Sequence, residues 1–171
     1  MEHMLWLDME MTGLDVNKEV PIEVAAVITN KKLESLETYH AVIRQPQHYL
    51  DNMDDWNKSH HGDSGLTAMI PSGKEPDLVE NDLIDLANRF WSDEKVVLCG
   101  NSIGQDRLFI DKYFSRFAEK LHYRMLDVTA FKLIFNNFYN QKFEKQNTHR
   151  ATDDIQESIN ELKFYLSFIR T

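Results

Sequence analysis

The order of the apolar segments along the chain is the feature that most constrains its fold. The first half contains three segments with the composition or two-residue alternation of β-strands, at residues 4–11, 22–29 and 38–44. The second half alternates between helical spacing and short apolar runs. Three strands followed by such an alternation predict an α/β fold with a mixed five-stranded sheet flanked by helices. We expect the first three strands to be antiparallel, and the later strands to lie parallel to the first.

The elements expected in the second half follow from the spacing of their apolar residues. In order they are a helix from Pro76, a strand at Val96–Cys99, a helix carrying Phe109 to Phe117, a strand at Met125–Val128, a helix at Ala130–Phe138 and a last helix from Ala151. Residues 45–75 show neither period, so we expect an irregular segment whose length indicates a functional surface. A length of 171 residues predicts a single domain over residues 1–171.

The composition argues against several classes of protein. The formal net charge is −9 without a long run of Lys and Arg, which is not typical of proteins that hold long nucleic acids in a basic groove. Any nucleic-acid substrate should therefore be short, or held mainly by a metal and a pocket. The single cysteine, Cys99, lies in an apolar run, so neither a disulfide framework nor a Cys zinc site is available. Without a membrane-spanning run or a targeting segment, we expect a cytoplasmic protein with no membrane partner.

Two carboxylates, Asp8 and Glu10, stand one residue apart in the first strand-like segment. Because side chains alternate between the two faces of a strand, both acids share a face with Trp6. The other face carries Leu5, Leu7, Met9 and Met11. Two adjacent acids on the inner part of a sheet repel each other, and a hard divalent cation such as Mg²⁺ or Mn²⁺ relieves that repulsion. The alternative is a half-solvated edge strand whose polar face carries acids.

Asp106 and Asp154 are the acids that can join this pair. Each lies near the start of an expected helix, beside apolar residues of the face that packs on the sheet. For Asp106 the alternative is a favourable interaction with the helix dipole. In the expected architecture both helices approach the ends of central strands, so the four carboxylates can converge. Together they would neutralise two divalent cations, which in phosphoryl transfer stabilise the attacking and the leaving oxygens.

His149 lies five residues before Asp154, in the loop that enters the last helix. With an ordinary pKa of about 6.5, a histidine there is suited to act as general base on the attacking water at neutral pH. The alternative is a loop histidine or a helix-cap contact. In the string from His149 to Asp154 we favour the catalytic interpretation.

Four stretches of the sequence occur in an order that is specific as a set. They are Asp8-Met9-Glu10-Met11-Thr12-Gly13-Leu14, Gly100-Asn101-Ser102-Ile103-Gly104-Gln105-Asp106, His122-Tyr123-Arg124 and His149-Arg150-Ala151-Thr152-Asp153-Asp154-Ile155. With Trp56-Asn57 and Ser64-Gly65-Leu66, this set resembles the oligoribonuclease family, which belongs to the DEDDh exonuclease superfamily and has a ribonuclease-H-like fold. The resemblance spans nearly the whole chain.

The resemblance implies a 3′→5′ exoribonuclease that releases 5′-mononucleotides from very short RNA and ends with dinucleotides. Two divalent ions, Mg²⁺ or Mn²⁺, would be held by the acids that match the family pattern, Asp8, Glu10, Asp106 and Asp154. His149 matches the general base that activates the attacking water. Asp153, one residue before a matched acid, points about 100° away from it on a helix, so we expect it to take no part.

The resemblance also implies how the substrate is held. Leu14 and Trp56 match the apolar pair that clamps two bases, and His61 matches a substrate-contacting histidine. The terminal 5′-phosphate would be capped by Ser102, Gln105, Arg124 and Thr129. Tyr123 matches a residue donated across a dimer interface, so the resemblance implies a homodimer. The alternative for Leu14, Trp56 and Tyr123 is ordinary packing near the surface.

Two other functions stay open at this point. One is a related DEDDh exonuclease that acts on longer single-stranded DNA or RNA. The other is a catalytically silent RNA-binding or scaffold domain, and the presence of all five expected catalytic side chains argues against it.

Overall fold

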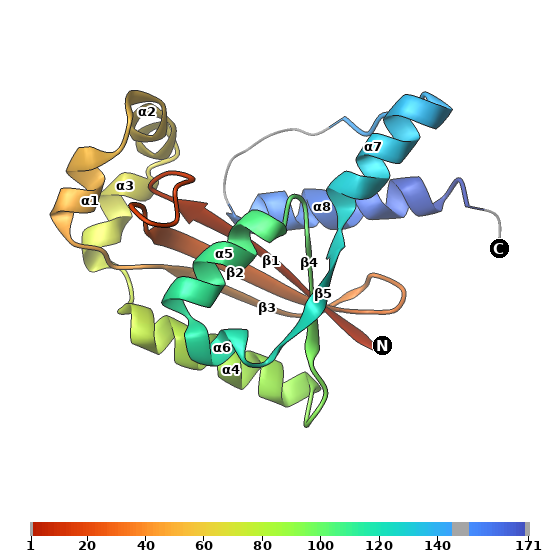
Figure 1. The fold of residues 1–171 in the computed structure, drawn as a ribbon, viewed down its shortest axis with the longest axis horizontal. Helices are drawn as coiled ribbons and strands as arrows, with labels where there is room; N and C mark the ends of the chain where they lie inside the picture. The colour runs from red at the N-terminus through yellow and green to blue at the C-terminus, as the bar shows by residue number, and fades with distance from the viewer. Residues whose placement is uncertain (1, 145–150, 170–171) are drawn as a thin grey trace.

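The computed structural model describes residues 2–144 and 151–169, and its centre is a mixed five-stranded sheet (Figure 1). The strands are β1 (His3–Met11), β2 (Pro21–Asn30), β3 (Ser35–Val42), β4 (Val96–Gly100) and β5 (Leu121–Asp127). They lie in the order β3-β2-β1-β4-β5. The first three strands are antiparallel, and β4 and β5 run parallel to β1. This arrangement confirms the α/β fold and the strand directions expected from the sequence.

Helices cover both faces of the sheet (Figure 1). One face packs against α4 (Pro76–Phe90), α5 (Gly104–Tyr113) and α6 (Ser115–Ala118). The other face packs against α7 (Val128–Tyr139) and α8 (Ala151–Leu166). Within the described residues, no helix combines the length and the apolar character needed to cross a membrane. The cytoplasmic location stays a prediction.

The central strand β1 is covered on both faces, and its side chains alternate as predicted. The face toward α4 and α5 carries Leu5, Leu7, Met9 and Met11. Trp6 lies on the opposite face, in the apolar cluster that includes residues of α8. Because alternation continues along the strand, Asp8 and Glu10 share the face of Trp6. Both acids therefore lie on the α8 side of the sheet.

Residues 45–75 are largely helical, so the prediction of an irregular segment there was wrong. They form α1 (Gln47–Asn52), α2 (Asp55–Asp63), α3 (Leu66–Met69) and the 3-10 turn η1 (Ile70–Ser72). Each helix is too short to show a convincing apolar period. Local contacts favour the start of α2, where the Asp54 carboxylate accepts the Asn57 N–H at 2.7 Å and caps the helix. Gly65, with φ of +76°, makes the turn before α3.

The helix expected to run through Phe117 is interrupted at Phe114, where φ is −130° and ψ is 54°. The buried carboxylate of Glu80 accepts the backbone N–H groups of Arg116 at 2.7 Å and of Phe117 at 3.1 Å. These bonds satisfy the free donors at the start of α6, which stabilises a separate short helix. A distant residue of α4 thus stabilises the start of α6.

Two boundaries near β5 also differ from the predicted ones. The strand begins at Leu121 instead of Met125. The prediction missed its first residues because His122 and Arg124 break the apolar run. Helix α7 begins at Val128 instead of Ala130, because the Asp127 carboxylate accepts the second N–H of the helix, from Thr129, at 2.9 Å.

Candidate active site

Three carboxylates gather near the carboxyl end of β1. Asp8 and Glu10 lie on one face of that strand, and Asp154 lies in the first turn of α8. One oxygen of each side chain lies within 4.8 Å of the others, and all three residues are half-buried. Oxygen donors at this spacing suit a hard divalent cation, which also offsets their mutual repulsion.

Asp106 adds a fourth acid beside this group, from the first turn of α5. The residue is 6% exposed, and its Oδ1 accepts the Met9 N–H at 2.9 Å. Burial, and after it the negative charges of Asp8 and Glu10, raise the pKa of Asp106 well above its ordinary value. The fourth acid therefore feels the group electrically, while one of its oxygens is engaged by the backbone of β1. It is not one of the three whose oxygens lie within 4.8 Å.

Glu23 anchors the start of α8, a role not predicted from the sequence. It is the cross-strand neighbour of Glu10 and is fully buried. One carboxylate oxygen lies 2.7 Å from His40 Nε2, and the other accepts the Ala151 N–H at 3.4 Å. A charged residue inside the apolar run of β2 was the available indication, because buried carboxylates need partners. His149, the predicted base, lies outside the described residues, which resume at Ala151.

A groove of about 470 Å³ connects the predicted base clamp with the acids. Its lining residues are Met9, Glu10, Met11, Gly13, Leu14, Asp54, Trp56 and Asn57. Leu14 is 75% exposed and Trp56 is 65% exposed, which is unusual for large apolar side chains unless a partner covers them. Because Glu10 belongs to both the groove and the acid group, the groove leads from the apolar side chains to the carboxylates.

The two adjacent histidines of α2 have different surroundings. His61, predicted to contact substrate, is buried, and its Nε2 donates to the Met11 carbonyl at 2.9 Å. Burial lowers the pKa of His61 below its ordinary value, which favours the neutral ring. His60 instead stacks on the Trp56 ring with centroids 4.4 Å apart. In this arrangement His61 holds the end of β1 through the Met11 carbonyl. A direct contact between His61 and substrate stays a prediction.

Ser102 and Thr129, both predicted to bind the 5′-phosphate, lie against each other. Their hydroxyl oxygens are 3.2 Å apart, and the Ser102 N–H points to both Thr129 Oγ1 and an Asp127 oxygen, each at 2.9 Å. Ser102 has φ of +49°, a left-handed conformation that these bonds stabilise. The turn after β4 and the start of α7 are thereby joined into one polar surface.

Gln105, predicted to bind the same phosphate, instead contacts the loop that follows β1. Its Nε2 donates to the Leu14 carbonyl at 2.7 Å. Two further residues of α5 hold the same loop: Lys112 donates to the Val16 carbonyl at 2.6 Å, and Tyr113 donates to the Glu19 carbonyl at 2.7 Å. Gln105 therefore fixes the loop that carries Leu14. Backbone carbonyls as acceptors leave no pattern in a sequence, so this anchoring could not be predicted.

Tyr123 and Arg124 lie on β5, at the edge of the sheet. Tyr123 is 75% exposed, and the Arg124 guanidinium carbon lies 5.1 Å from the centre of its ring. The His122 ring stacks on the same tyrosine at 4.5 Å. Tyr123 is therefore an exposed ring that contacts both a cation and an imidazole.

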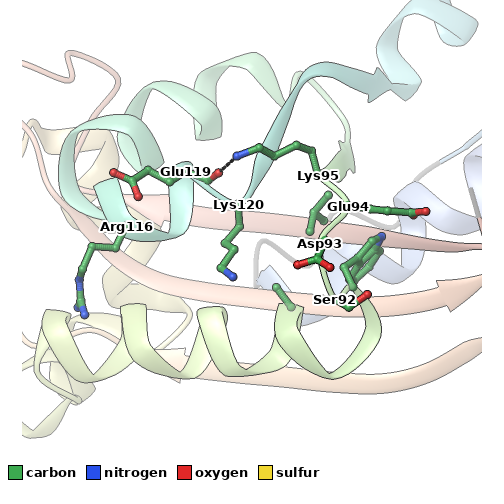
Figure 2. A pocket seen from close by; sticks show the side chains of 10 residues that line it. Ser92, Asp93, Glu94, Lys95, Arg116, Glu119 and Lys120 are labelled. Carbon is green, nitrogen blue, oxygen red and sulfur yellow. Dashed lines mark hydrogen bonds between the residues drawn. The ribbon is translucent and has the colours of Figure 1, made fainter.

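A second hollow, of about 320 Å³, lies between the end of α4, the start of β4 and α6, and Figure 2 shows the charged residues around it. The protein itself engages the cations that border it. Lys95 donates to the Glu119 carbonyl, and Lys120 donates to Asn88 Oδ1 at 2.8 Å. Arg116 pairs with a carboxylate of α4. We therefore assign no anion site to this hollow.

Known proteins resemble this chain over almost its whole length. Residues 5–162 match the model of the RNase_T exonuclease family. The oligoribonuclease of Francisella tularensis subsp. tularensis (strain WY96-3418) is 44% identical over 168 residues, which cover 96% of this chain and 94% of that protein. The chain belongs to the oligoribonuclease family. The human mitochondrial oligoribonuclease is 40% identical over 173 residues, covering 96% of this chain and 72% of that protein. Membership of the oligoribonuclease family makes the chain an enzyme, a 3′→5′ exonuclease, and confirms the resemblance of the four ordered stretches.

Solved structures of longer exonucleases share the oligoribonuclease fold. Exonuclease I from Methylocaldum szegediense superposes with a TM-score of 0.76 at 13% identity, over 98% of this chain and 41% of that one. The zinc-bound complex of E. coli exonuclease I with single-stranded DNA gives 0.75 at 14% identity, over 97% of this chain and 40% of that one. The chain spans about two fifths of these structures, and at such low identity the likeness concerns the fold alone.

Proposed function

We propose that this chain removes 5′-mononucleotides from the 3′ end of short oligoribonucleotides, preferring dinucleotides, in a single exonuclease domain over residues 1–171. The observation that most supports this proposal is the shared groove. Leu14 and Trp56 border it, and Glu10 belongs both to the groove and to the acid group. A short strand whose bases enter between the two apolar side chains has its phosphodiester directed toward the carboxylates.

The acids fit divalent metal ions, and we propose two of them, Mg²⁺ or Mn²⁺. Asp8, Glu10 and Asp154 offer oxygens within 4.8 Å of one another, and Asp106 lies beside them. When bound, such ions stabilise both the attacking and the leaving oxygens of a phosphodiester displacement. The contribution of the chain is to hold four carboxyl groups together and to place them against β1. His149 would take the proton of the attacking water.

The acidity of the chain supports a short substrate. A net charge of −9 gives no long-range attraction for a polyphosphate strand, so affinity must come from local contacts. Stacking on an aromatic side chain stabilises binding by about 1–3 kcal/mol per base and accepts any base. Trp56 would supply this stacking and Leu14 an apolar contact, together covering two bases, and each further nucleotide would add little.

We propose that the far end of the substrate is recognised by its 5′-phosphate. Ser102 and Thr129 present adjacent hydroxyls, and Arg124 presents an exposed guanidinium on the next strand. Phosphate accepts charge-assisted hydrogen bonds from a guanidinium and neutral ones from hydroxyls. Gln105 would act indirectly, through the Leu14 loop.

Turnover of RNAs of two lengths tests this function. We expect kcat/KM for a 5′-phosphorylated dinucleotide to exceed that for a 5′-phosphorylated 20-mer with the same 3′ end by at least about tenfold. The reason is that only the dinucleotide can place its terminal 5′-phosphate in the proposed phosphate site while its 3′ end is cleaved. A charge-assisted hydrogen bond to that phosphate contributes about 1.5–3 kcal/mol, and 1.4 kcal/mol is a factor of ten. Equal or faster cleavage of the long strand would instead favour the exonuclease of longer single strands. Binding of both RNAs without hydrolysis in Mn²⁺ would indicate a silent domain.

We also propose a homodimer formed through β5 and α7. Exposed apolar residues gather on these two elements, namely Tyr123, Met125, Leu133, Ile134, Phe138 and Tyr139. An edge strand with an apolar neighbour is a surface that proteins usually cover. A second copy would cover it and bring Tyr123 to the partner's groove.

Sedimentation tests the dimer. We expect the wild type to sediment as a dimer and Phe138→Asp to sediment as a monomer, because an aspartate at this 81% exposed position would be buried unpaired in the interface. Leu78→Asp, at an exposed apolar position on α4, is the matched control and should stay dimeric. A Phe138→Asp monomer with full activity on dinucleotides would contradict the proposed role of Tyr123.

A further inference from the structure

Asn101, in the turn after β4, bonds to two other parts of the proposed site. Its Nδ2 donates to Ser158 Oγ at 2.8 Å and to Glu161 Oε2 at 3.0 Å, both on α8. Its Oδ1 accepts the Thr129 hydroxyl of α7 at 3.4 Å. One side chain thus connects the surface proposed for the 5′-phosphate with the helix that carries Asp154.

Ser158 extends this connection to the acid group. Its hydroxyl accepts the amide of Asn101 and donates to the Asp154 carbonyl, one turn earlier on α8, at 2.8 Å. Ser158 is buried, so water does not compete for these bonds. Hydrogen bonds therefore run without a break from Thr129 through Asn101 and Ser158 to the backbone of Asp154.

Glu161 fixes the direction of the connecting amide. It is fully buried, and its carboxylate accepts from both Asn101 Nδ2 and the Tyr165 hydroxyl, the latter at 3.1 Å. Since the Glu161 oxygen accepts here, the NH₂ group of Asn101 faces α8 and its oxygen faces the Thr129 hydroxyl. Glu161 thus orients Asn101 by accepting its amide.

At the other end, Thr129 is bonded to Ser102. The Thr129 Oγ1 accepts the Ser102 N–H at 2.9 Å and lies 3.2 Å from the Ser102 hydroxyl. Because the Thr129 hydroxyl has a single proton and donates it to Asn101, a phosphate here would accept from the Ser102 hydroxyl and act on Thr129 through the Ser102 N–H. Occupancy of this surface can therefore restrain α8 through groups that never touch the substrate.

We propose that Asn101 is a positioning residue that couples recognition of the 5′-phosphate to the placement of Asp154. This inference rests on the proposed function. Coupling between two sites is reciprocal, so phosphate binding should order the first turn of α8, and a correctly placed α8 should favour the phosphorylated substrate. The dinucleotide would then be cleaved best because its phosphate, two nucleotides from the end, helps to complete the acid group.

Ser158→Ala and Asn101→Ala, each with two substrates, test this coupling. The measured quantity is the ratio of kcat/KM for a 5′-phosphorylated dinucleotide to kcat/KM for the same dinucleotide without the 5′-phosphate. We expect both variants to lower this ratio by about fivefold or more, the lower limit of common coupling between sites. Ser158→Ala removes one hydroxyl and keeps the helix packed, so it remains informative if Asn101→Ala fails to fold. Ser167→Ala is the matched control, because Ser167 makes the same kind of bond, to the Phe164 carbonyl at 2.6 Å, and should keep the wild-type ratio.

Hydrogen exchange supplies a readout that does not depend on turnover. In Mn²⁺, a 5′-phosphorylated dinucleotide with an uncleavable methylphosphonate link should protect the amides of the first turn of α8 in the wild type more than its unphosphorylated form does. The two variants should show equal protection with both ligands. A loss of kcat/KM that is equal for both substrates, with the phosphate still protecting α8, would overturn the coupling and leave the proposed function standing. Equal kcat/KM of the wild type for the two dinucleotides, with equal protection of α8, would overturn both the coupling and the proposed recognition of the 5′-phosphate.

Discussion

Asp154→Asn is expected to lower kcat by about 10³-fold or more, while Asp153→Asn changes it less than about twofold. The two acids are neighbours in the first turn of α8, but only Asp154 has an oxygen within 4.8 Å of Asp8 and Glu10, and Asp153 is exposed. Asparagine keeps the size of the side chain and removes its charge. Loss of a metal-holding carboxylate removes several kcal/mol of transition-state stabilisation, and 1.36 kcal/mol is a factor of ten in rate.

The pair Asp154→Asn and Asp153→Asn is matched, because each variant removes one negative charge from the same helix N-terminus and loses the same dipole interaction. Thermal unfolding separates the metal site from the fold. In chelator, Asp154→Asn should unfold no earlier than the wild type, since it relieves repulsion among the acids. In Mn²⁺ the wild type should gain stability by ligand binding and Asp154→Asn should gain less. Equal loss of kcat in both variants would show that the helix terminus, and not the acid group, was disturbed.

The parts of the fold that were predictable are those whose pattern repeats within one element. In β1, alternation alone predicts which side chains share a face of the sheet. Trp6 and the odd-numbered apolar residues indeed pack into different clusters. The helical segment at 47–72 was missed because its buried residues find their partners far away. Leu50, Leu66 and Ile70 pack with Ile22 of β2, and no local period reports such a contact.

The same distinction applies to the site. Strand alternation and helix starts place the acids, which is why Asp8, Glu10 and Asp154 could be brought together from the sequence alone. The surroundings of Gln105 and His61 depend on where the loop after β1 and helix α2 pack. Glu23, Asn101 and Glu161 act through backbone groups or buried partners on other elements. Residues whose role lies in the orientation of others carry no local pattern that reveals it.

His149→Ala is the second large effect we expect, with kcat lowered by about 10²- to 10⁴-fold, the range usual for loss of a general base. Binding of Mn²⁺ should be unchanged, because the proposed ligands are carboxylates and His149 is assigned to the proton of the attacking water. Calorimetric titration with Mn²⁺ alone measures the binding, and single-turnover cleavage of a dinucleotide measures the chemical step. Added imidazole should restore part of the lost rate, since it supplies a proton acceptor without a side chain.

His48→Ala is the matched control, because His48 is an exposed histidine of α1 whose ring centre lies 4.2 Å from that of Tyr49, and it should leave both measurements unaltered. Loss of Mn²⁺ binding in His149→Ala would make this residue a ligand and end its assignment as base. Unchanged kcat with intact Mn²⁺ binding would place the proton acceptor elsewhere. His60 would then be the imidazole to test, since it stacks on Trp56, whose side chain borders the groove.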